Sequence, residues 1–458
     1  MNHQIQIPET ALLVLSRLNE SFSAYLAGGC VRDYLLSRTP HDWDIATSAT
    51  PDEVKAALPE FQIRDTGLKH GTVTVIIGTD AYEVTTFRVD GRYSDQRHPD
   101  GVTFVTCIED DLARRDFTVN AMAMSLDGTI IDPYGGRKHL ADGLIACVGD
   151  PEERFHEDPL RILRAMRFAS KLGFQIGVRT SRAMLRSRYL LASVSSERIQ
   201  SELCKILAYN PTPVLRTYRE IFAETIPELR PCFDFEQHNP YHCYDVYEHI
   251  VASVEQAPPD ITVRLAMLFH DIGKPARYFE DDKGVGHFYG HAGVSADMTR
   301  AIMHRLCFSN REIHDVVELV AAHDTRFEPT PKFVKRMLNK YGEEQFRRLI
   351  EVRKADVMAQ SGYERKPRLE KIRRTIETLA AVLSDRSPFV LKDLAVDGHD
   401  LIRAGIPAGP EIGWMLNRLL ELVIEEILPN DHEILAKAAK QIQRDKWKEN
   451  KAKEDKHV

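Results

Sequence analysis

The sequence predicts an α+β protein in which strands come first and helices fill the remainder. Residues 70–87 alternate apolar and polar side chains, are rich in β-branched residues and are interrupted by a Gly-Thr-Asp turn, which predicts a β-hairpin. Residues 102–105 resume the strand pattern. From Asp142 onward the apolar residues recur mainly at helical spacing. A run of strands followed by a run of helices is typical of the α+β class.

Length, charge and cysteine usage narrow the class of protein. A chain of 458 residues predicts several domains. Its net charge of −7 argues against a uniformly basic surface, so a nucleic acid would have to bind a local basic cluster. No apolar run approaches the ~20 residues needed to span a bilayer, and the first residues do not resemble a secretory signal. The seven scattered cysteines fit reduced thiols. We therefore expect a cytoplasmic protein without a membrane partner. The sequence does not indicate an oligomeric state.

The stretch 28–44 combines a glycine pair with two closely spaced carboxylates. If Trp43 to Ile45 is a strand, Asp42 and Asp44 point to the same face. Adjacent carboxylates repel each other unless a hard cation such as Mg²⁺ lies between them. The glycine pair ahead of a helix start leaves backbone N–H groups for a phosphate. Solvated carboxylates and a simple turn are the alternatives, and they are the commoner explanation for either motif alone.

Two other N-terminal features are candidates for the same site. Glu83, on the second strand of the hairpin, is a candidate third metal carboxylate, and a plain cross-strand polar residue is an equal alternative. Residues 88–101 are rich in charge and contain glycine and proline, which predicts a mobile loop.

Arginines gather in two places further along. Arg115 belongs to an Arg-Arg-Asp motif that can bind phosphate or sugar in bidentate fashion, with a surface salt-bridge cluster as the alternative. A helix begins near Asp158, and Arg161, Arg164 and Arg167 recur along it at three-residue spacing. These arginines share one face beside the apolar stripe, which indicates either an anion-binding surface or a solvated basic face.

Histidines cluster in the second half of the chain. Five of them flank a His270-Asp271 pair near the end of an apolar helix predicted over residues 261–274. A single helical histidine is usually not a ligand, but a His-Asp pair with His249 nearby predicts a metal site completed by a later group.

Taken in order, these motifs resemble a known family. The segments GGCVRD, DWD, RRDFTVNAMA, DPYGG and EDPLRILRAMRF resemble those of class II CCA-adding tRNA nucleotidyltransferases and bacterial poly(A) polymerases, over residues 24–210. Residues 249–356 resemble an HD phosphohydrolase-type domain. The resemblance implies a nucleotidyltransferase palm, with a mixed β-sheet and helices on one side, followed by an all-helical C-terminal half that includes the HD-type domain.

The resemblance, together with a compositional break at Pro211-Thr212-Pro213, predicts a division into domains. We expect the following segments: a catalytic palm over 1–140, a base-binding helical neck over 141–210, a linker over 211–235, an HD-type helical domain over 236–360, and a C-terminal tRNA-binding body and tail over 361–458.

Residue roles follow from the same resemblance. Gly29 and Arg32 would hold the nucleoside triphosphate, and Asp42 and Asp44 would bind Mg²⁺. Arg115 would contact the sugar or the phosphates. The remaining predicted nucleotide ligands, which would face the base and its phosphates, are Asp158, Arg161, Arg164 and Arg167.

At the second site, His249, His270 and Asp271 match the start of the HD pattern and would hold a divalent transition metal, with His291 and Asp356 as candidates for its later members. Ala292 departs from the acid that related domains often have there.

The function implied is template-independent addition of CCA to the 3′ end of tRNA from CTP and ATP. Asp158 would accept from the exocyclic amine and Arg161 would donate to the ring nitrogen, a pattern shared by C and A only.

The loop 88–101 is the candidate for the switch from C to A, so shortening it should spare C addition and abolish A addition. An A-adding enzyme or a poly(A) polymerase is the alternative within the class. A metal-dependent HD phosphohydrolase with an RNA-binding module is the alternative from another class.

Overall fold

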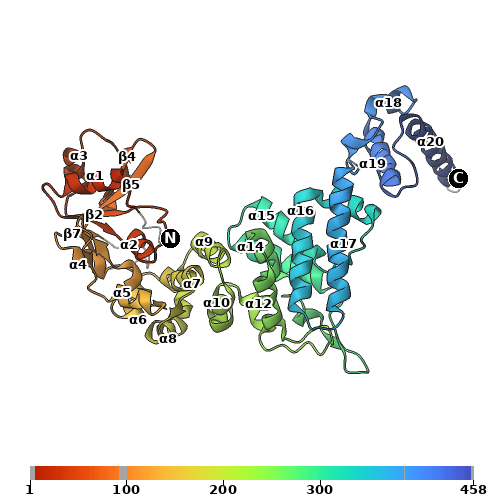
Figure 1. Cartoon of the computed structure of the whole chain (residues 1–458). Coiled ribbons are helices and arrows are strands. Elements are labelled where there is room, and N and C mark those ends of the chain that lie inside the picture. Colours follow the sequence, from red (N-terminus) through yellow and green to blue (C-terminus); the bar gives the residue numbers. More distant parts are fainter. Residues whose placement is uncertain (1–5, 92–100, 386, 455–458) are drawn as a thin grey trace. The chain divides into compact units, whose positions relative to one another are not determined.

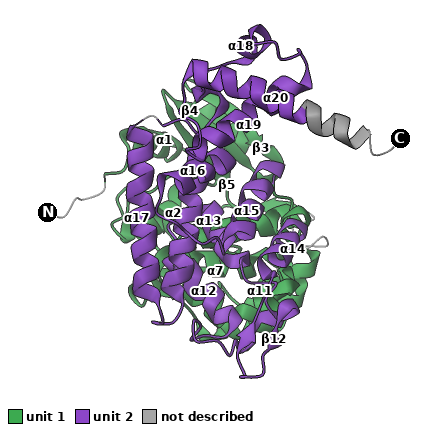
Figure 2. Cartoon of the chain, turned by 90° about the vertical axis from the view of Figure 1, so that its right-hand side faces the viewer, with its two compact units in different colours: residues 1–230, 302–308 green, residues 231–301, 309–458 purple. Residues whose placement is uncertain are grey.

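A computed structural model describes residues 6–91, 101–385 and 387–454, with side chains up to residue 446. The chain forms two compact units, residues 1–230 with 302–308 and residues 231–301 with 309–458 (Figure 2). Most of the loop 88–101 lies outside the described residues, and its proposed role stays a prediction.

A mixed seven-stranded sheet forms the start of the first unit (Figure 1). Its order is β3-β4-β5-β2-β1-β8-β9, and only β2 and β5 pair in parallel. The predicted hairpin is confirmed as β4 and β5. The strand bounds are β1 (Ala24–Ala27), β2 (Ile45–Thr47), β3 (Gln62–Gly67), β4 (Thr72–Ile77), β5 (Asp80–Thr86), β8 (Ala123–Met124) and β9 (Ile130–Ile131).

Short amphipathic helices accompany this sheet. They are α1 (Glu9–Leu18), α2 (Gly29–Leu35), α3 (Pro51–Ala57), α4 (Ile108–Ala113) and α5 (Gly136–Ala141), and a small hairpin joins β6 (Arg88–Asp90) to β7 (Val102–Phe104). Helix α3 begins at Pro51, because Thr50 and Glu53 form a capping box and proline occupies the first turn. Apolar residues from β1, β2, α4 and the segment before β8 form one buried core.

The first unit continues as a set of helices: α6 (Pro151–Glu157), α7 (Leu160–Leu172), α8 (Val178–Ser187), α9 (Ser196–Leu207), α10 (Thr212–Thr217) and α11 (Arg219–Thr225). The apolar stripe predicted for α7 is buried, and α7 packs against α9. The expected linker over 211–235 is corrected, since α10, α11 and a 3₁₀ turn over Pro227–Cys232 occupy most of it. Its prolines fit a first helical turn as well as a linker, which explains the error.

The second unit is helical apart from a small hairpin, β12 (Phe279–Glu280) with β13 (Gly286–His287). Its helices are α12 (Val246–Gln256), α13 (Ile261–Phe269), α14 (His291–Arg305), α15 (Asn310–Ala322), α16 (Pro331–Ala359), α17 (Arg365–Ser384), α18 (Gly398–Arg403), α19 (Pro410–Ile424) and α20 (His432–Glu454). The almost wholly buried α13 packs against α12, α15 and α16, so its end lies in the interior. Across the described part of the chain, no helix has the length and apolar character to cross a membrane.

Candidate functional site

A cavity of about 520 Å³ in the first unit gathers most of the predicted nucleotide ligands. Helix α2, the segment after α4 and the first turns of α7 and α9 contribute to it. Its predicted members are Gly29, Arg32, Arg115, Asp158, Arg161 and Arg164. Residues that the prediction left unassigned also line it: Gly28, Arg114, Asp116, Asn120, Leu160, Phe168 and Arg198.

Two arginines of this cavity are held rigidly from behind. Arg32 is buried, pairs with Asp33 through both carboxylate oxygens at 2.8 Å and donates to Asn120 Oδ1 at 2.6 Å. Arg115 donates to Asp111 Oδ2 at 3.1 Å. Burial alone would raise the pKa of Asp111, but the neighbouring arginines outweigh it and lower that pKa. Both guanidinium groups are therefore ordered before any anion arrives.

Gly28 makes close approach to Arg115 possible. Its φ is +84°, and a Cβ there would lie 2.4 Å from Arg115 Nη1. We expect Gly28→Ala to lose about 1–3 kcal/mol of unfolding free energy and to weaken triphosphate binding by displacing Arg115. Gly128 has the same φ with open space around it, so Gly128→Ala is a matched control. Urea unfolding together with the KM for CTP separates the two effects. Equal KM values for both variants would contradict the role assigned to this contact.

Asp116 anchors the opposite side of the cavity. It is buried, accepts from Arg164 Nε at 2.9 Å and from Asn120 Nδ2 at 3.1 Å. Burial raises the pKa of Asp116, but Arg164 and Asn120 outweigh this and hold it at about 2. The ring centroid of Phe168 lies 5.3 Å, 5.8 Å and 4.5 Å from the guanidinium carbons of Arg32, Arg164 and Arg167, so the ring packs against three cations. These partners come from distant segments, and the sequence held no signal for the pairing.

Asp158 and Arg161, the predicted base-reading pair, have protein partners. Asp158 accepts from Arg198 Nη2 at 2.8 Å and from the backbone N–H of Leu160 at 3.1 Å. Arg161 pairs with Glu157. Both side chains line the cavity, and Arg198 is a lining residue that the prediction missed.

Arg167 departs from the arrangement that spacing predicts. Its Nε lies 3.1 Å from Glu202, and it does not line the cavity. The three arginines of α7 follow one another along the helix as predicted, but each pairs with a different acid: Glu157, Asp116 and Glu202. Three-residue spacing determines the position of each Cβ on the helix, but it does not determine the position of the guanidinium group.

The predicted magnesium ligands lie at the start of β2. The strand begins at Ile45, which corrects the expectation that it includes Trp43 and Asp44. The backbone oxygen of Asp44 still accepts from Ala27 N–H at 3.0 Å, which fixes the segment against β1. Asp42 is exposed and pairs with His41.

The pKa of Asp44 indicates crowded negative charge. Burial raises this pKa to about 6, with help from Glu83 and Asp42 and against the opposing effect of Arg115. Glu83 precedes Val84, which lies opposite Ile45 in the parallel register, so it faces the neighbourhood of Asp44. This oxygen-only donor set fits Mg²⁺. Among the described residues, however, the groups of three ligand atoms within 4.8 Å of one another are found only in the second unit.

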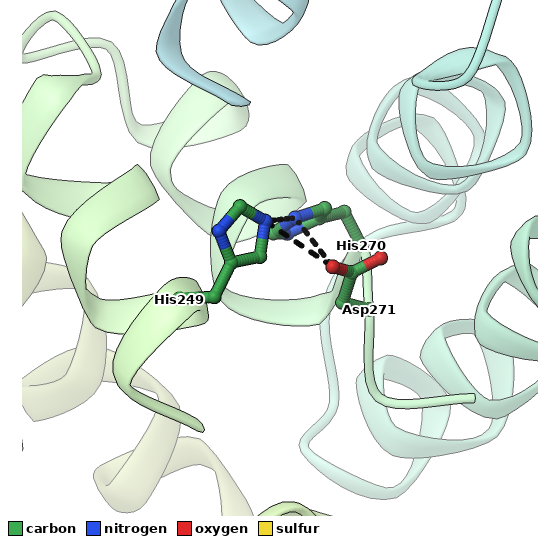
Figure 3. Close-up of side chains that lie close together, drawn as sticks. All are labelled: His249, His270 and Asp271. Atoms are coloured by element: carbon green, nitrogen blue, oxygen red, sulfur yellow. Dashed lines mark hydrogen bonds and ion pairs between the residues drawn. The ribbon is translucent and has the colours of Figure 1, made fainter. Parts of the chain in front are cut away.

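The predicted metal trio of the second unit does come together (Figure 3). His249 lies on α12, while His270 and Asp271 follow the end of α13, and all three are buried. Asp271 Oδ2 is 3.3 Å from His249 Nε2 and 3.2 Å from His270 Nε2. The two Nε2 atoms are 3.2 Å apart.

Three more buried residues extend this trio into a cluster of six. Asp356 Oδ1 lies 3.2 Å from His249 Nε2. On the other side, His291 Nε2 and His323 Nε2 lie 3.2 Å and 3.5 Å from Asp271 Oδ1. We call these residues the histidine–aspartate cluster: His249, His270, Asp271, His291, His323 and Asp356. His323 was noted among the clustered histidines but not assigned as a ligand.

The hydrogen bonds of the cluster fix the direction of its lone pairs. His270, His291 and His323 each place Nδ1 at 2.7–2.8 Å from the backbone oxygen three residues earlier. A carbonyl oxygen only accepts, so we assign the proton to Nδ1 and a lone pair to Nε2. The Nε2 atoms of His291 and His323 are 3.1 Å apart and both face Asp271.

Acceptors that face acceptors are stable when a cation lies between them. Two ligand atoms about 2.1 Å from one ion, with a ligand–ion–ligand angle of about 90–110°, lie roughly 3.0–3.4 Å apart. These distances are close to the separations in this cluster. The donor set therefore fits one divalent ion on each side of Asp271. Lys274 Nζ, 2.6 Å from Asp271 Oδ2, is a buried cation that the prediction missed.

Comparison with known proteins identifies the family. The family described as "Poly A polymerase head domain" matches residues 24–146, "Probable RNA and SrmB- binding site of polymerase A" matches 173–229, and "tRNA nucleotidyltransferase domain 2 putative" matches 287–439. A CCA-adding enzyme of Lactobacillus delbrueckii subsp. bulgaricus is 34% identical over 434 residues, 93% of this chain and 96% of the relative. This chain belongs to the CCA-adding enzyme family.

Further members of the family agree with this assignment. The CCA-adding enzyme of Geobacillus thermodenitrificans is 51% identical over 201 residues, 44% of this chain and 49% of the relative. A crystal structure of the Bacillus stearothermophilus CCA-adding enzyme in complex with CTP has a TM-score of 0.69 at 31% identity, covering 97% of this chain and all of that one. A Thermotoga maritima enzyme complexed with tRNA shares the fold at 20% identity, with a TM-score of 0.59 and coverage of 96% and 97%. The palm and the helical C-terminal half are confirmed.

Proposed function

We propose that the chain adds CCA to the 3′ end of tRNA from CTP and ATP, with Asp42 and Asp44 as its metal-binding carboxylates. The observation that supports this best is the cavity of the first unit. It is lined by arginines that protein partners hold in place and by Asp158 at the start of a helix. Relatives named CCA-adding enzymes match over nearly the whole chain, and one was solved with CTP. A tRNA transcript lacking its three terminal nucleotides should accept two labelled C residues, and failure to accept any would contradict the proposal.

The residues of the site divide the work. Asp42 and Asp44, with Glu83 nearby, would hold Mg²⁺, which when bound activates the 3′-hydroxyl and stabilises the leaving pyrophosphate. Arg32 and Arg115 would neutralise the triphosphate without needing to be reordered. Catalysis of this kind depends on positioning and charge, which ordered arginines supply.

Base selection is proposed for Asp158 and Arg161. The carboxylate of Asp158 can accept from the exocyclic amine of C or A, but U presents an oxygen acceptor there. Arg198 donates from Nη2 to Asp158 Oδ2 at 2.8 Å and so orients that carboxylate.

Removing this acceptor should relax selection. We expect Asp158→Asn to lower the preference for CTP over UTP by about 10²-fold, because the amide can donate to the oxygen of U. Competition between labelled CTP and UTP on a tRNA lacking CCA measures the ratio. Glu153→Gln, an exposed carboxylate on α6 that does not line the cavity, serves as the control for general disturbance of this region. A preserved ratio in Asp158→Asn would contradict the assignment.

The histidine–aspartate cluster favours a second candidate function, a metal-dependent phosphohydrolase. The observation behind it is that several buried lone pairs converge on Asp271. This arrangement is unfavourable in the protein interior unless a cation lies between them. Divalent ions held there would supply an activated water for attack on phosphorus. Lys274 would add positive charge beside the shared carboxylate.

A further inference from the structure

A second cavity, of about 670 Å³, opens in the second unit beside the histidine–aspartate cluster. Three of its lining residues touch cluster members directly. Arg353 Nη1 lies 2.7 Å from Asp356 Oδ2, and Gln360 Nε2 donates to Asp356 Oδ1 at 2.8 Å. The ring of His242 is 5.0 Å from that of His249. This cavity therefore reaches the layer of side chains that surrounds the candidate metal ligands.

The rest of the cavity wall carries three cations and two carboxylates, which leaves an excess of positive charge. Arg326, Arg368 and Lys371 line it, and no ion pair to a described carboxylate is formed by any of the three. Asp324 and Glu364 also line it, but neither lies within ion-pair distance of these cations. In contrast, the arginines of the first unit's cavity each have an acidic or carbonyl partner.

Arg368 is the most informative of these cations. It is half-buried, and burial together with Arg353 lowers its pKa. Its guanidinium carbon lies 5.6 Å from the ring centroid of Tyr241, and that ring packs edge-on against Tyr363 at 4.9 Å. Two neighbouring guanidinium groups, of which one lacks a carboxylate, are favourable when an anion lies between them.

Aromatic surface completes the cavity. Tyr241 contributes a ring that is fixed by its neighbours, and Tyr289 is 72% exposed at the rim. Exposed aromatic faces beside unpaired cations are the combination that binds nucleosides carrying phosphate.

We propose that this cavity is the substrate site of the histidine–aspartate cluster, and that Arg326, Arg368 and Lys371 hold a second phosphate of a phosphorylated nucleoside. The inference rests on the proposed phosphohydrolase function. In the reaction, the oxygen of water bonds to phosphorus at the cluster, the phosphorus–oxygen ester bond breaks, and the leaving alcohol takes up a proton. The second phosphate is not cleaved and serves only for recognition. A free nucleotide and the phosphorylated end of an RNA share this chemistry.

The kinetic test uses the full chain loaded with Mn²⁺ and three substrates: p-nitrophenyl phosphate, adenosine 3′,5′-bisphosphate and an RNA oligonucleotide with a terminal phosphate. We expect Arg368→Ala to raise KM for one or both nucleoside substrates about tenfold or more and to change kcat/KM for p-nitrophenyl phosphate by less than about twofold. Lys366→Ala, on the same helix but outside the cavity, should match the wild type. Comparing the bisphosphate with the RNA identifies the source of the nucleoside. An equal effect on all three substrates, or none, overturns the inference.

A binding test separates this inference from the proposed hydrolysis. Calorimetric titration of the chain with adenosine 3′,5′-bisphosphate should show a site whose Kd is about tenfold or more higher in Arg368→Ala than in the wild type and in Lys366→Ala. A wild type that hydrolyses none of the substrates but retains this Arg368-dependent site would remove the hydrolase function and leave the second phosphate site standing. Identical Kd values in all three proteins would remove the phosphate site.

Discussion

Asp44→Asn is expected to reduce incorporation of C and A into tRNA by about 10³-fold or more. Asparagine keeps the shape of the side chain but lacks the negative charge that Mg²⁺ needs. The loss should appear in kcat, because Arg32 and Arg115, which are proposed to bind the triphosphate, are unchanged. Initial rates with labelled CTP and a tRNA transcript lacking CCA measure it.

Two controls make that result specific. Asp52→Asn replaces an exposed carboxylate on α3 and should retain full incorporation. Hydrolysis by the second unit should be unchanged in Asp44→Asn. An Asp44→Asn protein with near-normal incorporation would mean that the two-carboxylate assignment is wrong.

The second large effect is expected from Asp271→Asn. Asp271 lies between both halves of the histidine–aspartate cluster, so its loss should remove bound metal and lower phosphohydrolase activity by about 10²-fold or more. Its loss also leaves Lys274 buried without its carboxylate, which should cost about 3–5 kcal/mol of unfolding free energy. Elemental analysis, p-nitrophenyl phosphate hydrolysis and urea unfolding measure the three effects.

The molecules of Asp271→Asn that fold should retain addition of CCA. His304→Asn replaces an exposed histidine of α14 and is the matched control, since it should leave metal content and stability unaltered. Metal content in Asp271→Asn equal to that of the wild type would contradict the role of Asp271 as a shared metal ligand, and a wild type without bound metal would show that the cluster is a structural hydrogen-bond network.

Local sequence signals predicted the elements well. The hairpin of β4 and β5 and the buried stripe of α7 each depend on residues a few positions apart. The histidine trio was also within reach, because His270 and Asp271 are adjacent and His249 lies one helix earlier. In contrast, a segment that contains prolines can be either a linker or the start of a helix. The prolines near α10 lie at the start of that helix, so composition alone predicted the wrong structure there.

Partners across long separations could not be predicted. Arg164 reaches Asp116 and Asp158 reaches Arg198, in each case about forty or more positions away in the chain. The same holds for Arg167, whose partner Glu202 turns it out of the cavity. Helical spacing places these residues on a face, but tertiary packing decides which acid each arginine meets, as the packing of α7 against α9 does for Arg167 and Glu202.

The most direct test of the central claim uses three tRNA transcripts that end before C, after CC and after CCA. Each is incubated with labelled CTP and labelled ATP separately, and the product ends are read by sequencing. CCA addition predicts two C residues on the first transcript, one A on the second and neither nucleotide on the third. Absence of C incorporation on the first transcript, with A added to the second, would indicate an A-adding enzyme. Repeated A addition to the third transcript would indicate a poly(A) polymerase, and either result would contradict the proposed function.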